Sequence, residues 1–468
     1  MNDYQIFLKS KEQKIEDSGF EINSDSLNKQ AFEWQRDIVK WAIKKGRAAL
    51  FEDCGLGKTL QELMIAEAIA IKTSKPSLIL TPLAVADQTR REGEKFGISA
   101  KVIRNQNDID NEKVNITNYE ILDHFDMSAF GCVILDESSI LKDYTSQTKK
   151  DLVDKCSVVP YRYAATATPS PNDYVELGNH AEFLGIMTRT EMLATYFVHD
   201  GGDVSKWRLK GHAESKFFEW VASWAVCITN PSDLGYDGSS YILPPLNIHE
   251  HVVKSKNLED ADGQIRLFAS ESLSLNERRA ARRDSLEDRV KLASEIANST
   301  DKQVLVWCDL NDESKALANA INGAVEVRGD HAPLYKVESM NGFTEGKVKS
   351  LVSKPKIAGW GMNWQNCDTV IFVGLSDSFE AFYQAVRRCW RFGQVNPVDV
   401  HIIISEAEGC VKANIERKQA DAERMTSELV KFTKDILTAE IRHTTRITES
   451  YVPTEIMILP NWLRSEVA

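Results

Sequence analysis

Short apolar runs alternate with helix-like stretches along most of this chain, and this alternation most limits how it can fold. The first half has such runs at 48–51, 77–80, 114–117, 132–135 and 161–165, and the second half at 303–307, 324–327, 369–373 and 398–404. Short, nearly continuous apolar strands between helices indicate parallel sheets covered on both faces. The predicted fold class is therefore α/β, with two tandem parallel-sheet lobes.

The same pattern divides the chain into parts. The expected parts are an N-terminal extension, lobe one, a helical insertion, lobe two, and a C-terminal helical brace with a tail: 1–30, 31–187, 188–245, 246–405 and 406–468. The insertion loses the alternation and holds Trp207, Trp220 and Trp224. Two prolines in LPPL at 243–246 break regular structure and predict a hinge before lobe two.

The charge and cysteine content exclude several classes of protein. A net charge of -12 does not suit a basic coat for nucleic acid, so any such binding requires a local groove. The eight cysteines are scattered without a CxxC pair, which predicts no zinc site and suits a reducing compartment. The chain has no stretch of 18 apolar residues and no export signal at its start, so we expect a cytoplasmic protein that does not span a membrane.

The sequence GLGKT at 55–59 follows the first predicted strand. Gly55, Leu56 and Gly57 would let backbone N–H groups approach phosphates closely, Lys58 would neutralise them, and Thr59 would offer its hydroxyl to Mg²⁺. The full phosphate-loop pattern is not met, because Glu52 occupies its first glycine position. The alternative is an ordinary helix N-terminus with a solvated lysine, but the strand before it and the helix after it favour a nucleotide site.

Two further motifs carry chemistry. Asp136 and Glu137 end the apolar run CVIL, where Asp136 would hold Mg²⁺ and Glu137 would polarise the attacking water. In QAVRRCWRFGQ at 384–394, Arg388 and Arg391 stand three residues apart, so one helix face would present both to a γ-phosphate. The alternatives are a strand that meets a solvated loop and a surface helix with solvated arginines.

These motifs, in this order, resemble the Swi/Snf-like branch of superfamily II helicases, which places ATP between two recombinase-A-like lobes. The resemblance covers about residues 30–405. It implies that Gln35 reads adenine and that Gln61 and Gln384 belong to the nucleotide site. Ser138 and Ser139 depart from the family's usual Ala-His, Ala358 from a glycine, and Trp390 from a histidine. The compact size and the tryptophan-rich insertion look like helicases encoded by bacterial viruses.

Other motifs of the resemblance concern nucleic acid and coupling. Backbone contacts to nucleic acid are implied for Thr81, Pro82, Thr117, Asn118, Gly359 and Asn363. Coupling of hydrolysis to lobe movement is implied for Thr166, Thr168, Pro169 and Asn172. The expected function is an ATP-dependent, Mg²⁺-requiring translocase or helicase on DNA, preferably double-stranded. An RNA helicase, or a nucleotide-gated clamp with little turnover, remains the alternative.

Three weaker features stay closer to structural roles. The arginines at 278, 279, 282 and 283 are interleaved with acidic residues, which favours a self-paired solvated helix face. Phe217, Trp220, Val221, Trp224 and Ile228 follow helical spacing and predict a core stripe, with a base-stacking platform as the alternative. We interpret His249 and His251 as structural, because no third metal ligand lies near them in the sequence.

Overall fold

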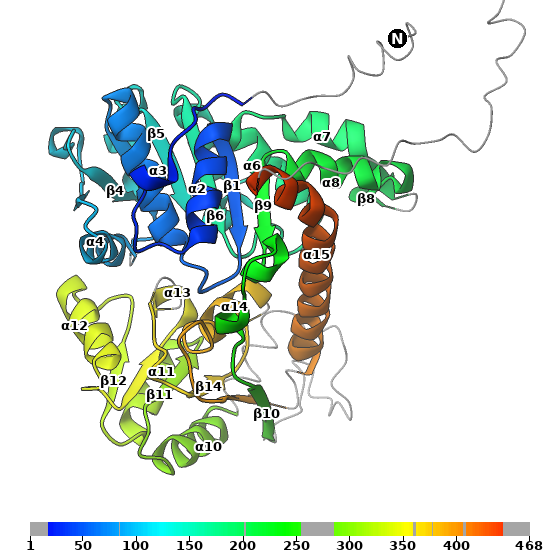
Figure 1. Ribbon diagram of the computed structural model, residues 1–468. Coiled ribbons are helices and arrows are strands. Elements are labelled where there is room, and N and C mark those ends of the chain that lie inside the picture. Colours follow the sequence, from blue (N-terminus) through cyan, green and yellow to red (C-terminus); the bar gives the residue numbers. More distant parts are fainter. Residues whose placement is uncertain are drawn as a thin grey trace, which may run out of the picture.

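The structure is a computed structural model that describes residues 17–83, 85–200, 203–253, 285–358, 362–376, 378–405 and 409–442. Two α/β lobes lie one above the other in Figure 1, and the long helix α15 (Gly409–Ile441) runs beside both. The predicted fold class, with its two parallel sheets and a C-terminal helical brace, is confirmed. No described helix is long and apolar enough to cross a membrane.

Lobe one is built on a seven-stranded sheet in the order β3-β4-β2-β5-β6-β1-β9, with every neighbouring pair parallel. Its strands are β1 (Arg47–Glu52), β2 (Ser77–Thr81), β3 (Ala100–Val102), β4 (Val114–Asn118), β5 (Cys132–Asp136), β6 (Tyr161–Thr166) and β9 (Ala225–Ile228). Its longer helices are α2 (Glu33–Lys45), α3 (Lys58–Thr73), α4 (Ala86–Lys95), α5 (Gln147–Cys156), α6 (Leu177–Leu184), α7 (Arg189–Tyr196) and α8 (Glu214–Ala222).

Both faces of this sheet are covered, as the sequence pattern requires. Successive residues of a strand point to opposite faces. Ala49 and Phe51 of β1 belong to one apolar cluster with residues of α5, α6 and α8, whereas Ala48 and Leu50 belong to another with residues of α2 and α3. The parallel sheet thus separates two cores, and its strand ends are left free to carry loops.

The segment 188–245 differs from the helical insertion that the sequence predicted. It contains α7 and α8, but also the antiparallel pair β7 (Phe197–Asp200) and β8 (Asp203–Leu209), and β9, which joins the first sheet beside β1. The run at β9 is apolar and fully buried, so it forms a covered edge strand beside β1 rather than the end of a helical stripe. Where each domain begins and ends remains a prediction.

The aromatic stripe expected in this segment is core. Phe217, Trp220, Val221 and Trp224 are all buried, and Phe217 contacts the rings of Tyr174 and Tyr196 edge-on. Ile228 lies on β9 instead of on the helix. Buried rings cannot stack on nucleic-acid bases, so the alternative of a base-stacking platform does not fit this structure.

Lobe two is built on a six-stranded parallel sheet in the order β10-β15-β14-β11-β13-β12. Its strands are β10 (Leu246–Val253), β11 (Val304–Cys308), β12 (Ala324–Val327), β13 (Ser350–Ser353), β14 (Thr369–Val373) and β15 (Val398–Ser405). Its helices are α10 (Leu286–Asn298), α11 (Asn311–Ala320), α12 (Pro333–Thr344), α13 (Pro355–Ala358) and α14 (Phe379–Val386). The four predicted strands are present, and β10 and β13 are additional.

The edge of this sheet brings the two predicted structural histidines to a third one. His249 of β10 pairs in register with His401 of β15, and their rings stack 4.8 Å apart. His249 Nε2 lies 2.8 Å from Asp399 Oδ1, and His251 Nε2 lies 3.1 Å from His401 Nδ1. Among the described residues no group of three or more His, Cys, Asp and Glu side chains is arranged to hold a metal ion. The four arginines at 278–283 lie outside the described residues.

Candidate active site between the two lobes

The predicted phosphate loop connects β1 to α3 and depends on two glycines. Gly55 and Gly57 have φ values of +90° and +79°, in the left-handed region that side chains disfavour. A Cβ on Gly57 would lie 2.4 Å from Gln35 Nε2, and a Cβ on Gly55 would lie 3.0 Å from Phe392 Cβ. Gly57 therefore leaves room for Gln35 of lobe one beside the loop. Gly55 leaves room for Phe392 of lobe two.

Lys58 begins helix α3, so its ammonium group stands at a helix N-terminus, where backbone N–H groups lack helical partners. Its Nζ donates hydrogen bonds to the carbonyl oxygens of Glu52 (2.7 Å) and Asp53 (3.1 Å). Thr59 follows in the first turn. The free N–H groups and the lysine together make a positively polarised cradle for phosphate.

The acidic pair lies at the carboxyl end of β5. Asp136 is the last residue of the strand, and Glu137 adopts a left-handed φ of +56°. Besides Ser74, it is the only non-glycine residue with positive φ in the described chain, a strain often found at functional sites. The pKa of Asp136 is raised to about 7, mainly by burial and further by the neighbouring Glu137 charge, against the opposing effect of Lys58. Burial also raises the pKa of Glu137.

Lobe two contributes the two predicted arginines. They do not share a helix face, because α14 ends at Val386 and both residues lie in the turn that follows. Arg388 donates to Gln384 Oε1 (2.6 Å) and to the carbonyl oxygen of Gln384 (2.9 Å). Arg391 donates to Asn363 Oδ1, and burial together with the Arg388 charge lowers its pKa to about 10. Two crowded guanidinium groups in a buried place are poised to receive an anion.

The loop, the acidic pair and the arginines meet in one cavity of about 90 Å³. Lobe one supplies most of the lining, and lobe two supplies a polar edge. The lining residues are Cys54, Gly55, Gly57, Lys58, Thr59, Val85, Gln88, Glu92, Asp136, Glu137, Asn363, Arg388 and Arg391. The cavity therefore brings together residues that were predicted from motifs far apart in the sequence.

Some lining residues were not predicted. Gln88 and Glu92 come from α4, four residues apart on one helix face, and burial raises the pKa of Glu92 while Arg391 lowers it. Their spacing was the available signal, but nothing in the sequence showed which face of α4 meets the cavity. Asn363 was expected on nucleic acid, yet it lines this cavity and accepts from Arg391.

Four residues assigned to nucleotide binding lie behind the cavity wall. Gln35 Nε2 donates to the carbonyl oxygen of Leu56 (2.8 Å), and Gln61 Nε2 donates to Glu52 Oε2 (2.8 Å). Gln384 accepts from Arg388, and Leu56 is buried. In this structure all four support the loop or the arginine, and adenine contact by Gln35 remains a prediction.

The predicted nucleic-acid contacts divide into exposed and buried groups. Thr81 and Thr117 are fully buried, and Thr117 Oγ1 donates to the carbonyl oxygen of Ile103 (2.9 Å). A buried hydroxyl does not reach a phosphate. The expected contacts of these two side chains with nucleic acid therefore do not fit this structure. Pro82 and Asn118 are more accessible, and Gly359 lies outside the described residues.

Two of the four predicted coupling residues line a second cavity, of about 520 Å³, where both lobes meet α15. Thr168 and Pro169 form part of its wall, and Thr166 Oγ1 accepts from the Thr168 N–H group (3.1 Å). His180 Nε2 lies 3.1 Å from the Pro169 carbonyl oxygen. Burial lowers the pKa of His180 to about 4, so this ring is neutral at physiological pH. Asn172 donates to Glu176 Oε1 (2.7 Å).

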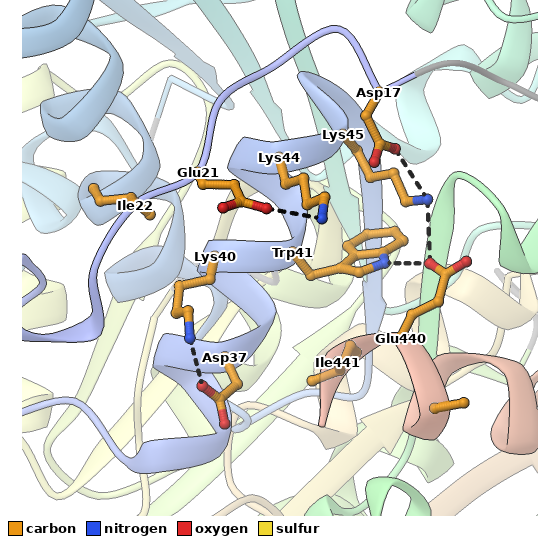
Figure 2. A pocket seen from close by; sticks show the side chains of 11 residues that line it. Asp17, Glu21, Ile22, Asp37, Lys40, Trp41, Lys44, Lys45, Glu440 and Ile441 are labelled. Carbon is orange, nitrogen blue, oxygen red and sulfur yellow. Dashed lines mark hydrogen bonds and ion pairs between the residues drawn. The ribbon is translucent and has the colours of Figure 1, made fainter. Parts of the chain in front are cut away.

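A third and larger cavity, of about 680 Å³, lies away from this chemistry, between α2 and the end of α15 (Figure 2). Its three lysines are each paired with a carboxylate: Lys40 with Asp37, Lys44 with Glu21, and Lys45 with Asp17 and Glu440. Trp41 Nε1 donates to Glu440 Oε2 (2.9 Å). The two contacts made by Glu440, with Lys45 and Trp41, tie the brace to lobe one.

The residues of the 90 Å³ cavity fit a divalent cation. Thr59 and Asp136 offer the hydroxyl and carboxylate oxygens that Mg²⁺ prefers. Glu52, Glu62 and Asp136 are buried close to Lys58 and to the half-buried Glu137, and both carboxylate oxygens of Glu62 lack a hydrogen-bond partner within the described chain. Buried carboxylates in excess over cations favour binding of a further positive charge.

Comparison with known proteins agrees with this arrangement. Residues 34–193 match the model of the SNF2-related domain, and residues 287–393 match the model of the helicase conserved C-terminal domain. Together the two matches cover more than half of the chain. The first contains the phosphate loop and the acidic pair, and the second contains the two arginines.

Individual relatives are distant. The SWI/SNF-related matrix-associated actin-dependent regulator of chromatin subfamily A-like protein 1 of Drosophila melanogaster is 21% identical, over 81% of this chain and 53% of that protein. The chromodomain-helicase-DNA-binding protein 1-like of Danio rerio is 22% identical, over 78% and 41%. The chain thus spans about half of their length or less. The Sulfolobus solfataricus SWI2/SNF2 ATPase core in complex with dsDNA is 17% identical with a TM-score of 0.41, over 90% of this chain and 98% of that one.

Proposed function

We propose that this chain, an SNF2-related ATPase with a helicase C-terminal domain, hydrolyses ATP between its lobes to move along duplex DNA. Such domains imply nucleic-acid-dependent ATP hydrolysis. One observation carries the proposal: Lys58, Thr59, Asp136 and Glu137 of lobe one line the same cavity as Arg388 and Arg391 of lobe two.

The residues of the cavity divide the chemistry between them. Lys58 and the N-terminal amides of α3 bind the β- and γ-phosphates, and Glu137 orients the attacking water and accepts its proton. Its raised pKa suits an acceptor near neutral pH. Thr59 and Asp136 would hold Mg²⁺, which when bound neutralises phosphate charge. Arg388 and Arg391 stabilise the charge on the transferred phosphoryl group.

A site shared by two lobes couples chemistry to movement. The γ-phosphate attracts lobe-two arginines toward the lobe-one cradle, and its loss removes that attraction, so the cycle closes and opens the cleft. Thr168 and Pro169 follow β6, which ends at Thr166, and line the adjoining 520 Å³ cavity beside α15. We infer that movement of this loop transmits the opening and closing of the cleft to helix α15.

Duplex DNA is the proposed track, and a cytoplasmic location is proposed with it. The names of several relatives refer to DNA, including DNA binding in the Danio rerio protein. Contacts to phosphates rather than to bases suit movement without sequence preference. The accessible candidates for such contacts are Pro82 and Asn118.

Phosphate release should be measured with duplex DNA, single-stranded DNA, RNA and no nucleic acid. We expect duplex DNA to stimulate turnover most, and triplex displacement to reveal movement along it. Stimulation by RNA alone would instead identify an RNA helicase. If Lys58→Ala released phosphate at the same low rate as the unaltered chain, the chain would be a clamp rather than a motor.

A further inference from the structure

A direct link between the lobes beside the phosphate loop runs through Arg387, a residue without a predicted role. Arg387 caps the C-terminus of α14 and is only 3% exposed. Its Nη2 donates to Asp53 Oδ2 at 2.6 Å and to the carbonyl oxygen of Cys54 at 2.8 Å. Tyr383 of α14 also donates its hydroxyl to Asp53 Oδ1. Lobe two therefore holds both the side chain and the backbone at the entry of the phosphate loop.

The arginines assigned to the γ-phosphate make different contacts. Within the described residues, the side-chain hydrogen bonds of Arg388 and Arg391 go to Gln384, Met362 and Asn363, all in lobe two. Both are thus oriented by their own lobe and left facing the cavity. Their distance from the cradle must be set by something else.

Helix α14 is attached to lobe one at both ends. Glu380, in its first turn, forms an ion pair with Lys142, which follows the acidic pair of lobe one. Arg387, at its last turn, forms the pair with Asp53. The Arg387 guanidinium also lies 5.1 Å from the centre of the Trp390 ring, a cation–π contact within lobe two. Two attachments along one short helix fix how α14 sits over the strand ends of lobe one.

We propose that Arg387, acting with Asp53 and Tyr383, is a positioning residue: a latch that brings Arg388 and Arg391 to the phosphate cradle before ATP arrives. The latch favours the closed arrangement of the lobes, so part of the ordering needed for ATP binding is already present. Burial of the guanidinium limits the screening of this contact by solvent, and removing Asp53 would leave a buried positive charge without its partner. This inference rests on the proposed function, since it concerns the same cavity.

The test compares Arg387→Gln, Asp53→Asn and the double variant with the unaltered full chain. We expect each single variant to raise the KM for ATP about tenfold, within the usual range of coupling between sites. At saturating ATP and duplex DNA, kcat should stay within about twofold, because the groups that face the phosphate remain. Small-angle X-ray scattering of the nucleotide-free variants should show a larger radius of gyration.

The double variant and a matched control make the result specific. The double variant should raise KM by clearly less than the product of the two single effects, because both changes remove the same Arg387–Asp53 contact. Fully additive effects would overturn the latch. Lys302→Gln breaks an ion pair of the same 2.6 Å length inside lobe two, with Asp368, and should change neither KM nor scattering. Unchanged KM and scattering in Arg387→Gln would also overturn it.

Two failures remain distinguishable. If the unaltered chain shows no DNA-stimulated hydrolysis, the proposed function fails, while scattering of the nucleotide-free variants still decides the latch. If Arg387→Gln shows a loss of helical signal in far-UV circular dichroism, the latch is tested with Asp53→Asn instead. The Asp53 side chain is partly exposed, and asparagine has nearly the same shape as aspartate.

Discussion

Lys58 and Arg391 line one cavity of about 90 Å³, although they belong to different lobes and to motifs at opposite ends of the chain. Lys58 stands at the N-terminus of α3, and Arg391 lies in the turn after α14. Each lobe alone presents half of a phosphate site, and the consequences of that division can be measured.

Replacing Glu137 by glutamine should separate binding from hydrolysis. The amide keeps the size of the side chain but cannot accept the proton of the attacking water. We expect ATP affinity to stay within about threefold and kcat to fall by at least about 100-fold, the usual contribution of a general base. Fluorescent-nucleotide binding and phosphate release on the same preparation check this, and normal turnover would refute the assigned role.

Replacing Gly57 by alanine should weaken ATP binding, because a Cβ there would lie 2.4 Å from Gln35 Nε2 and would push this side chain away from the loop that it supports. Gly97→Ala is a matched control, since Gly97 has a similar φ of +74° but no atom within 4 Å of the added Cβ. The control should lose about 1 kcal/mol of stability from backbone strain alone and bind ATP normally. Equal ATP affinity in the two variants would show that the contact with Gln35 is unimportant.

His180 should make folding stability depend on pH. Burial lowers its pKa from 6.5 to about 4, so the unfolded chain takes up this proton before the folded chain does. The stabilisation is therefore complete above pH 6.5 and is lost as the pH falls toward 4. The full loss is on the order of 3 kcal/mol. Thermal unfolding of the unaltered chain and of His180→Gln at pH 7 and pH 5 checks this: the variant should lose less on acidification.

The sequence was sufficient where local pattern and tertiary structure agree. Buried runs such as Cys132–Asp136 became parallel strands, and strand ends meet at one edge, so Asp136 was placed beside Lys58 correctly. Prediction from the sequence failed where a short apolar run could be either helix or strand. The run Ala225–Ile228 continues the spacing of α8 but forms a strand that pairs with β1. Periodicity alone does not separate a buried strand from a buried helix turn.

Contacts between distant segments were beyond prediction for a different reason. Nothing near Asp53 in the sequence indicates Arg387, because their contact depends on how the lobes are docked. Glu92 likewise enters the cavity only because α4 faces lobe two. For Thr117, a motif position suggested a surface contact, whereas the strand turned its hydroxyl into the protein, where it bonds to Ile103.

The shared cleft is tested most directly by Arg391→Ala, with ATP binding, phosphate release and far-UV circular dichroism measured on one preparation. The lobe-one cradle is untouched, so the variant should fold and bind ATP. Its duplex-DNA-stimulated phosphate release should fall by at least about 1,000-fold, the usual effect of losing an arginine at the transferred phosphoryl group. Phosphate release at the rate of the unaltered chain would contradict the account, because it would mean that lobe two takes no part in hydrolysis.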